Sequence, residues 1–121
     1  MKESIIKTKS FAFAVRIIKL YQYLCDTKKE YVLSKQLLRS GTSIGANVRE
    51  GLNAESKKDF IHKLAIAQKE CDETLYWLEL LKETNYLNQW EFENIQNDAA
   101  EIMKITKSII ITTKQNITHN S

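Results

Sequence analysis

The stretch "RSGTSIGANVREG", residues 39–51, contains every glycine of this 121-residue chain, namely Gly41, Gly45 and Gly51, and the chain has no proline. Clustered glycines are typical of a phosphate-binding loop, a hinge, or a helix that another helix approaches closely. A Walker loop needs GxxxxGK[ST], but no Lys follows Gly45. A dinucleotide fingerprint needs GxGxxG after a strand, and that pattern is absent too.

Helical spacing explains this stretch better than a loop does. Two sets of residues recur side by side in alternating steps of four and three. The apolar stripe is Leu37, Gly41, Ile44, Val48 and Gly51, and the polar stripe is Gln36, Ser40, Ser43, Asn47 and Glu50. Residues four apart share one helix face, where glycine lets another backbone come close. We therefore predict a helix here, with Gly51 near its C-terminal end.

The polar stripe has two interpretations. It is a hydrogen-bonded seam that fixes the register between two helices, or it is a contact site for a ligand or partner. If the next helix returns antiparallel, Ser40 lies near Glu70, and Arg39 can pair with Glu70 or Glu73. Partly buried polar groups need partners, so a structural seam should be satisfied within the chain.

Three further segments have helical periodicity. Apolar positions step by four and three from Phe60 to Leu81, and again from Phe92 to Thr113. Capping patterns occur in "TKKE" at 27–30, "SKKD" at 56–59 and "NQWE" at 88–91, and Asn85 is a predicted stop. Short turns favour antiparallel neighbours. The predicted fold is all-α: a single-domain, up-down-up-down four-helix bundle over residues 1–121, with helices at about 5–26, 29–53, 57–84 and 88–116.

Composition is that of an ordinary globular domain, with 43% hydrophobic and 27% charged residues. The longest stretch without Asp, Glu, Lys or Arg is nine residues, against the roughly 18 that a spanning helix needs. The start "MKESIIKTKS" has no apolar signal segment. We predict a cytoplasmic protein with no membrane contact, whose Cys25 and Cys71 are free thiols of the core.

Positive charge is concentrated in the first part of the chain. The net charge is +3, divided into +6 for residues 1–51 and −3 for residues 52–121. A basic half attracts polyanions, and it equally attracts the acidic half of its own chain. The candidate nucleic-acid-binding residues are Lys9, Arg16, Lys19, Lys28, Lys29, Lys35, Arg39 and Arg49. No aromatic residues are interleaved for base stacking, so these cations would read phosphate and shape rather than sequence.

No catalytic or metal-binding constellation is visible in the sequence. A di-iron bundle needs two carboxylate-x-x-His motifs, but the one helical match is Asp59 with His62, and His119 lies in the tail. No Cys–His or Ser–His pair suggests an activated nucleophile. We predict a non-enzymatic protein with no metal and no cofactor. Tyr76 and Trp77 flank the seam of their helix, which indicates either a subunit interface or a wide core face.

Four segments together form a recognisable pattern: "FAFAVRIIKL", "EYVLSKQLLRSGTSIGANVREG", "SKKDFIHKLAIAQKECDETLYWLELL" and the "TNYL" turn. They resemble a bacterial four-helix-bundle family, named after the protein encoded by intervening sequences in large-subunit ribosomal RNA genes. The resemblance covers about residues 10–87, with a looser helical tail. Its most specific part is QLxRSxxSIxANxxEG, formed here by Gln36, Leu37, Arg39, Ser40, Ser43, Ile44, Ala46, Asn47, Glu50 and Gly51.

This resemblance implies an antiparallel bundle that assembles into a homopentameric ring. A relative in fold, the accessory protein of diversity-generating retroelements, uses a basic ring surface to engage nucleic acid and a reverse transcriptase. The resemblance therefore implies a homo-oligomeric accessory protein that binds structured RNA or DNA, with a protein partner such as a reverse transcriptase. The alternative is a protein–protein adaptor or scaffold without nucleic-acid affinity. The family has no agreed catalytic residues, so none is assigned.

Overall fold

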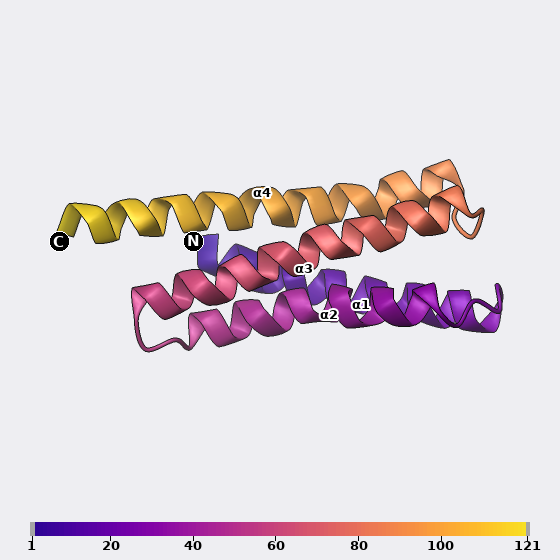
Figure 1. Ribbon diagram of the computed structural model, residues 1–121, viewed down its shortest axis with the longest axis horizontal. Helices are drawn as coiled ribbons and strands as arrows, with labels where there is room; N and C mark the ends of the chain where they lie inside the picture. The colour runs from indigo at the N-terminus through magenta and orange to yellow at the C-terminus, as the bar shows by residue number, and fades with distance from the viewer. Residues whose placement is uncertain (1, 121) are drawn as a thin grey trace.

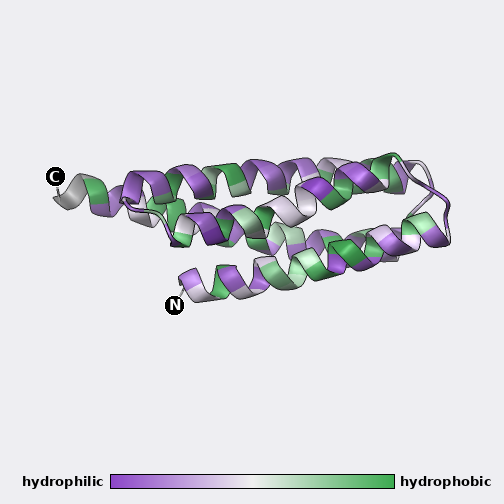
Figure 2. Ribbon diagram, turned by 90° about the horizontal axis from the view of Figure 1, so that it is seen from below, coloured by the Kyte–Doolittle hydropathy of each residue, from purple (hydrophilic) through white to green (hydrophobic). Residues whose placement is uncertain are grey.

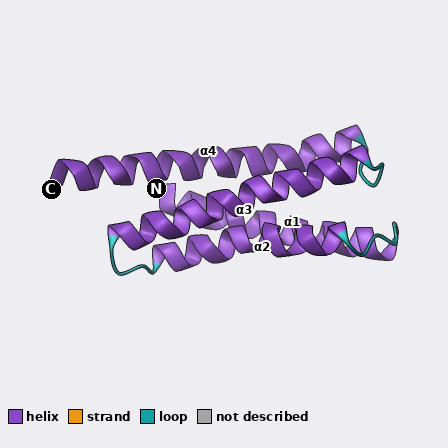
Figure 3. Ribbon diagram, in the orientation of Figure 1, coloured by secondary structure: helices purple, strands orange, loops and turns teal. Residues whose placement is uncertain are grey.

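The computed structural model describes residues 2–120. Its four helices are α1 (Lys2–Asp26), α2 (Leu33–Leu52), α3 (Lys57–Glu83) and α4 (Gln89–Asn120), and no strand occurs in this part of the chain (Figure 3). The helices run alternately in opposite directions, with α2 against α1 and α3, and α4 against α3 and α1 (Figure 1). The predicted all-α fold of four helices is confirmed.

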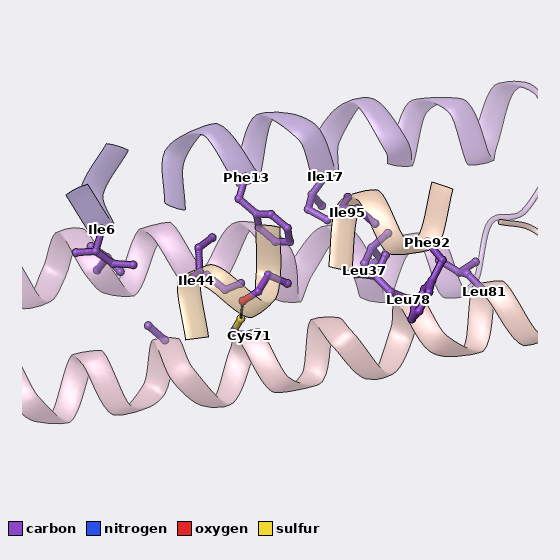
Figure 4. Packing of buried hydrophobic residues seen from close by; sticks show 14 of the residues in the cluster. Ile6, Phe13, Ile17, Leu37, Ile44, Cys71, Leu78, Leu81, Phe92 and Ile95 are labelled. Carbon is purple, nitrogen blue, oxygen red and sulfur yellow. Dashed lines mark hydrogen bonds between the residues drawn. The ribbon is translucent and has the colours of Figure 1, made fainter. Parts of the chain in front are cut away.

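The core lies along the bundle axis and receives side chains from all four helices. Hydrophobic and hydrophilic residues alternate along each helix rather than forming long blocks (Figure 2). The predicted seam of α3 is buried at Leu64, Ala67, Cys71, Thr74, Leu78 and Leu81. Phe13 and Ile17 point from α1 toward the core residues of the other helices (Figure 4). The periodicity of the sequence thus identified the inner face of the bundle.

Two of the three predicted caps form as expected. The Ser56 hydroxyl accepts a hydrogen bond from the Asp59 backbone N–H at 3.0 Å and begins α3. Asn88 and Glu91 cap α4 reciprocally, since the side chain of each accepts the backbone N–H of the other at 2.8 Å. Asn85 follows α3 in a left-handed conformation, with a φ of 68°. This conformation ends the helix as predicted.

The start of α2 was predicted wrongly. Expected near residue 29, α2 instead begins at Leu33. Lys29 has a φ of 57°, which no right-handed helix contains. The Glu30 carboxylate accepts the backbone N–H groups of Val32, Leu33 and Ser34 at 3.1, 3.0 and 2.6 Å. These amides have no partner inside the helix, so Glu30 acts as the cap from outside it.

Glu30 is only 7% exposed, although it lies in a connection between helices. Burial disfavours the charged carboxylate, but hydrogen bonds from the backbone N–H groups of Ser34, Leu33 and Val32 outweigh it and hold the pKa of Glu30 below its ordinary value. A lowered carboxyl pKa stabilises the fold above the pKa of the unfolded chain. That stabilisation is lost as the pH falls through the folded-state pKa.

Glu30→Gln is expected to lower the free energy of unfolding by about 1–2 kcal/mol at pH 7. The substitution replaces one acceptor oxygen with an NH₂ donor that faces backbone N–H donors. Urea denaturation at a series of pH values measures the difference. The difference should begin to shrink as the pH falls below the ordinary pKa of a glutamate, about 4.3, and it should disappear once the pH has passed the lowered pKa of Glu30. Glu55→Gln is the control, since Glu55 is an exposed loop carboxylate. Equal stability of Glu30→Gln and the wild type at pH 7 would contradict the capping role.

The glycines of α2 lie where neighbouring side chains and backbone approach. A Cβ at Gly41 would be 2.7 Å from Ile17 Cγ1 of α1, and one at Gly45 would be 3.3 Å from the backbone oxygen of Ser10. Gly51 lies near the C-terminal end of α2, as predicted, but it is itself helical, and no glycine has a positive φ. A Cβ there would be 2.7 Å from Leu64 Cδ2. All three glycines therefore serve close packing.

α1 and α4 are longer than predicted. α1 begins at Lys2 rather than near residue 5, and α4 continues to Asn120 rather than ending near 116. Ile6 is almost fully buried, which ties the first turns of α1 to the core. After Gly51 the chain has neither glycine nor proline, so no residue type that breaks helices interrupts α4. The end of α4 extends past the other helices (Figure 1).

Candidate nucleic-acid interface

Two of the predicted basic residues join α1 to α4. Lys9 Nζ lies 2.8 Å from a carboxylate oxygen of Glu101. Arg16 pairs with Asp98 and also donates a hydrogen bond to the side-chain oxygen of Asn94 at 2.6 Å. These cations are half-exposed, but each has a carboxylate beside it. Both cations therefore pair with carboxylates of the acidic second part of the chain, which is the internal attraction that the charge distribution allowed.

A third predicted cation, Arg39, joins α2 to α3. Its guanidinium lies 3.2 Å from a carboxylate oxygen of Glu70 and also pairs with Glu73, as the antiparallel register predicted. The indole N–H of Trp77 donates to the same Glu73 carboxylate at 3.0 Å. Trp77 is half-buried against the core, whereas Tyr76 is exposed and meets the Trp77 ring edge-on, with centroids 5.1 Å apart. Of these two rings, that of Tyr76 is the one largely open to a partner.

The polar stripe of α2 is satisfied within the chain. The hydroxyl oxygens of Ser40 and Thr74 are 2.9 Å apart and join α2 to α3 in the core. Ser43 donates to the backbone oxygen of Arg39 at 2.6 Å, and Asn47 donates to that of Ser43 at 2.8 Å. Among the side chains that the structure describes, no buried nitrogen or oxygen lacks a hydrogen-bond partner. These contacts favour the structural interpretation of the stripe.

The two ends of the polar stripe reach the surface. Glu50 forms an ion pair with Lys63 of α3 at 3.1 Å. Gln36 is exposed near the start of α2. The stripe thus runs from one exposed end through a buried centre to the other, and its centre is a contact between helices.

The connection between α1 and α2 follows the exposed Asp26 and carries exposed lysines for which the described residues form no ion pair. We define the basic loop as residues 27–35, the connection together with the first residues of α2, which include Lys28, Lys29 and Lys35, all exposed. The single carboxylate of this segment, Glu30, is turned inward onto the backbone of α2. The Lys28 ammonium lies 5.9 Å from the centroid of the Tyr23 ring. The exposed charge of the basic loop is therefore entirely positive.

Arg49 lies elsewhere, near the other end of α2. Its guanidinium is 5.4 Å from the centroid of the exposed Phe11 ring of α1. Arg49 therefore does not extend the basic loop. The eight predicted cations thus fall into groups. Three lysines cluster in the basic loop, Arg49 stands alone, and three other cations pair with carboxylates. The remaining cation is Lys19.

Lys19 lines a groove between α1 and α4 with a volume of about 350 Å³. We call it the α1–α4 groove; its lining includes Arg16, Lys19, Leu20, Tyr23, Trp90 and Ile95. Tyr23 and Trp90 are far apart in the sequence, and the lack of aromatic interleaving there did not reveal that the fold places both beside Arg16 and Lys19. One signal was available, because Trp90 lies in the first turn of a helix, outside its apolar seam.

The family model of the 23S rRNA-intervening sequence protein matches residues 2–108. The chain belongs to this family. It is also similar to a crystal structure from Bacteroides thetaiotaomicron VPI-5482, a protein with unknown function from the S23 ribosomal protein family. The sequence identity is 56%, the TM-score is 0.90, and the similarity covers 91% of this chain and 98% of that one. No curated protein matches the chain.

The family signature QLxRSxxSIxANxxEG serves packing in this intervening-sequence protein. Ser40, Ile44 and Gly51 from it are buried, and Arg39 and Glu50 form ion pairs with α3. Within residues 2–120, no three His, Cys, Asp or Glu side chains are grouped so as to hold a metal ion. None of the helices in that range combines the length and apolar character that crossing a membrane requires.

Proposed function

We propose that this intervening-sequence protein is a non-enzymatic, homo-oligomeric accessory protein that binds structured RNA or DNA through the basic loop. The observation that supports this proposal is the inward orientation of Glu30, which leaves Lys28, Lys29 and Lys35 as the exposed charges of residues 27–35. Lysine ammonium groups without a carboxylate partner remain available to phosphate oxygens.

Assembly would strengthen a modest charge. Each chain carries +3, so a homopentamer would carry about +15 and would focus a positive potential on repeated basic loops. Several weak phosphate contacts on one particle also raise the effective affinity for a long polyanion. Binding of this kind should depend steeply on salt concentration.

The triple variant Lys28→Gln/Lys29→Gln/Lys35→Gln is expected to lose most nucleic-acid binding at low ionic strength. Each lost phosphate contact should reduce the slope of log K against log salt by about 0.7–0.9. Electrophoretic mobility shift with a structured RNA and a DNA duplex, repeated over a salt series, measures both quantities. The substituted side chains are exposed, so the fold should persist.

The matched control is Lys57→Gln/Lys58→Gln/Lys69→Gln. These three lysines are also exposed, and each triple variant brings the net charge from +3 to zero. If binding depends on the basic loop, the control retains it. Equal losses in both variants would show that only total charge matters, and that result would contradict the assignment of the loop.

The second candidate function is a protein–protein adaptor without nucleic-acid affinity. It is favoured by an exposed apolar stripe on α1, formed by Phe11, Val15 and Ile18 at helical spacing. The exposed Tyr76 of α3 offers a further contact. An oligomer that binds no nucleic acid at low salt would support this alternative. A single-chain mass by light scattering would exclude the ring in both proposals.

A further inference from the structure

The α1–α4 groove combines flat aromatic walls with a positive rim. Trp90 is 72% exposed and Tyr23 is 36% exposed, although both line the groove. The half-buried Leu20 and the buried Ile95 contribute apolar lining. Exposed aromatic rings beside cations are the combination with which proteins stack unpaired nucleobases and hold the adjoining phosphates.

Most polar groups around the groove are already engaged, which leaves one cation. Arg16 is held by Asp98 and Asn94. The Glu91 carboxylate also lines the groove, but it accepts the backbone N–H of Asn88 as the cap of α4. Lys19 is exposed, and no ion pair involves it within residues 2–120. The lining therefore carries two cations, Arg16 and Lys19, against one carboxylate, Glu91, and Lys19 is the cation that no carboxylate engages.

The groove is continuous with the basic loop. Tyr23 lines the groove, and the ammonium of Lys28 lies 5.9 Å from the centroid of its ring. A strand whose phosphates follow Lys28 and the basic loop could therefore place a base against Tyr23. A nearby phosphate would then lie within reach of Lys19.

We infer that the α1–α4 groove holds an unpaired base of an RNA loop, stacked on Trp90 and Tyr23, with the adjoining phosphate on Lys19. The inference rests on the proposed function and adds a base contact to it. Bases in a duplex are stacked and paired, whereas RNA loops and bulges present bases that can turn outward onto aromatic rings. Stacking accepts every base, so the groove selects unpaired over paired segments rather than one sequence.

Trp90→Ala tests this site with two probes: an RNA hairpin with an unpaired loop, and a blunt duplex with the sequence of its stem. The variant should bind the hairpin about tenfold more weakly, from the loss of one stacked base. Its affinity for the duplex and its salt slope should be unchanged, since stacking releases no counterions. Ile111→Ala is the control, because Ile111 is a 57% exposed apolar side chain of α4 outside the groove. It should bind both probes as the wild type does.

Tryptophan fluorescence provides a direct readout. The chain has two tryptophans, so a Trp77→Phe background leaves Trp90 as the only reporter. The hairpin should quench Trp90 emission, and the duplex should not. Unchanged emission with bound hairpin, or wild-type hairpin affinity of Trp90→Ala, would overturn the base contact.

The remaining outcomes separate this inference from the proposed function. Loss of hairpin binding in the basic-loop variant, together with full binding by Trp90→Ala, would refute the groove and leave the proposed function intact. Absence of all binding by the wild type would refute both. A smaller native mass of Trp90→Ala would identify the groove as a contact between copies and overturn the inference. Equal competition by single-stranded DNA of the loop sequence would overturn the assignment to RNA.

Discussion

Gly41→Leu is expected to leave the chain largely unfolded. A Cβ at this position would be 2.7 and 2.8 Å from the Cγ1 and Cγ2 atoms of Ile17, whereas carbon atoms in contact prefer about 3.5–4.0 Å. Ile17 is fully buried in the middle of α1, so it has no space into which to withdraw. Overpacking by a methylene or two costs about 1–3 kcal/mol, and a leucine adds four carbons. The total stability of such a domain is about 5–15 kcal/mol.

Circular dichroism and urea denaturation would measure this effect against graded controls. Ala46→Leu places the same side chain at an exposed position of α2 and should be tolerated. Gly51→Ala should cost less than Gly41→Leu, because its nearest atom is the flexible end of Leu64. The double variant Ile17→Ala/Gly41→Ala should be more stable than Gly41→Ala alone, because Ile17→Ala removes the two Cγ atoms that the added Cβ would meet. Wild-type cooperative unfolding of Gly41→Leu would disprove the close approach of α1 and α2.

The glycine stretch shows what helical spacing can and cannot predict. The step of four from Gly41 to Gly45 correctly predicted a helix that another helix approaches. The spacing placed Gly51 in the apolar stripe but did not show that it stays helical, because a glycine that ends a helix and one that packs against a neighbour look alike in sequence. The distinction depends on Leu64 and Lys63, whose carbons lie 2.7 and 3.2 Å from the Cβ position. Those contacts exist only once α3 is in place.

The start of α2 shows the same limit for caps. The spacing of Thr27 and Glu30 fits a capping box, and the pattern predicted the helix four residues too early. Glu30 does cap α2, but from a turn outside the helix, where it contacts three backbone amides at once. That geometry requires Lys29 in a left-handed conformation. A non-glycine residue gives little local signal for this conformation.

The candidate interface was predictable in its charge but not in its arrangement. Charge counting located the cations in the first half of the chain. Whether a cation is paired depends on contacts such as Lys9 with Glu101, which are distant in sequence. The aromatic walls of the α1–α4 groove were missed for the same reason, since Tyr23 and Trp90 meet only through the packing of α1 against α4.

Phe13→Ala is expected to lower the free energy of unfolding by about 3–5 kcal/mol, the range for truncating a buried aromatic residue. The ring is 1% exposed and points from α1 into the core (Figure 4). Its loss would leave a cavity beside an existing hollow of about 120 Å³ that Phe13 lines together with Ile102 of α4. The surrounding helices are long and straight (Figure 1), so they should collapse only partly into the space. Urea denaturation of the purified variant measures the loss.

The ion pairs across the same seam provide the comparison. Lys9→Gln and Arg16→Gln remove charges that pair with Glu101 and Asp98, and half-exposed pairs contribute about 0–1 kcal/mol each. Each variant should therefore lose far less stability than Phe13→Ala, and the difference from the wild type should shrink further in high salt. If the ion-pair variants were as unstable as Phe13→Ala, electrostatic contacts would be holding α1 to α4. A much larger loss of stability in Phe13→Ala than in the ion-pair variants would show that apolar side chains hold α1 to α4, while the ion pairs orient the helices.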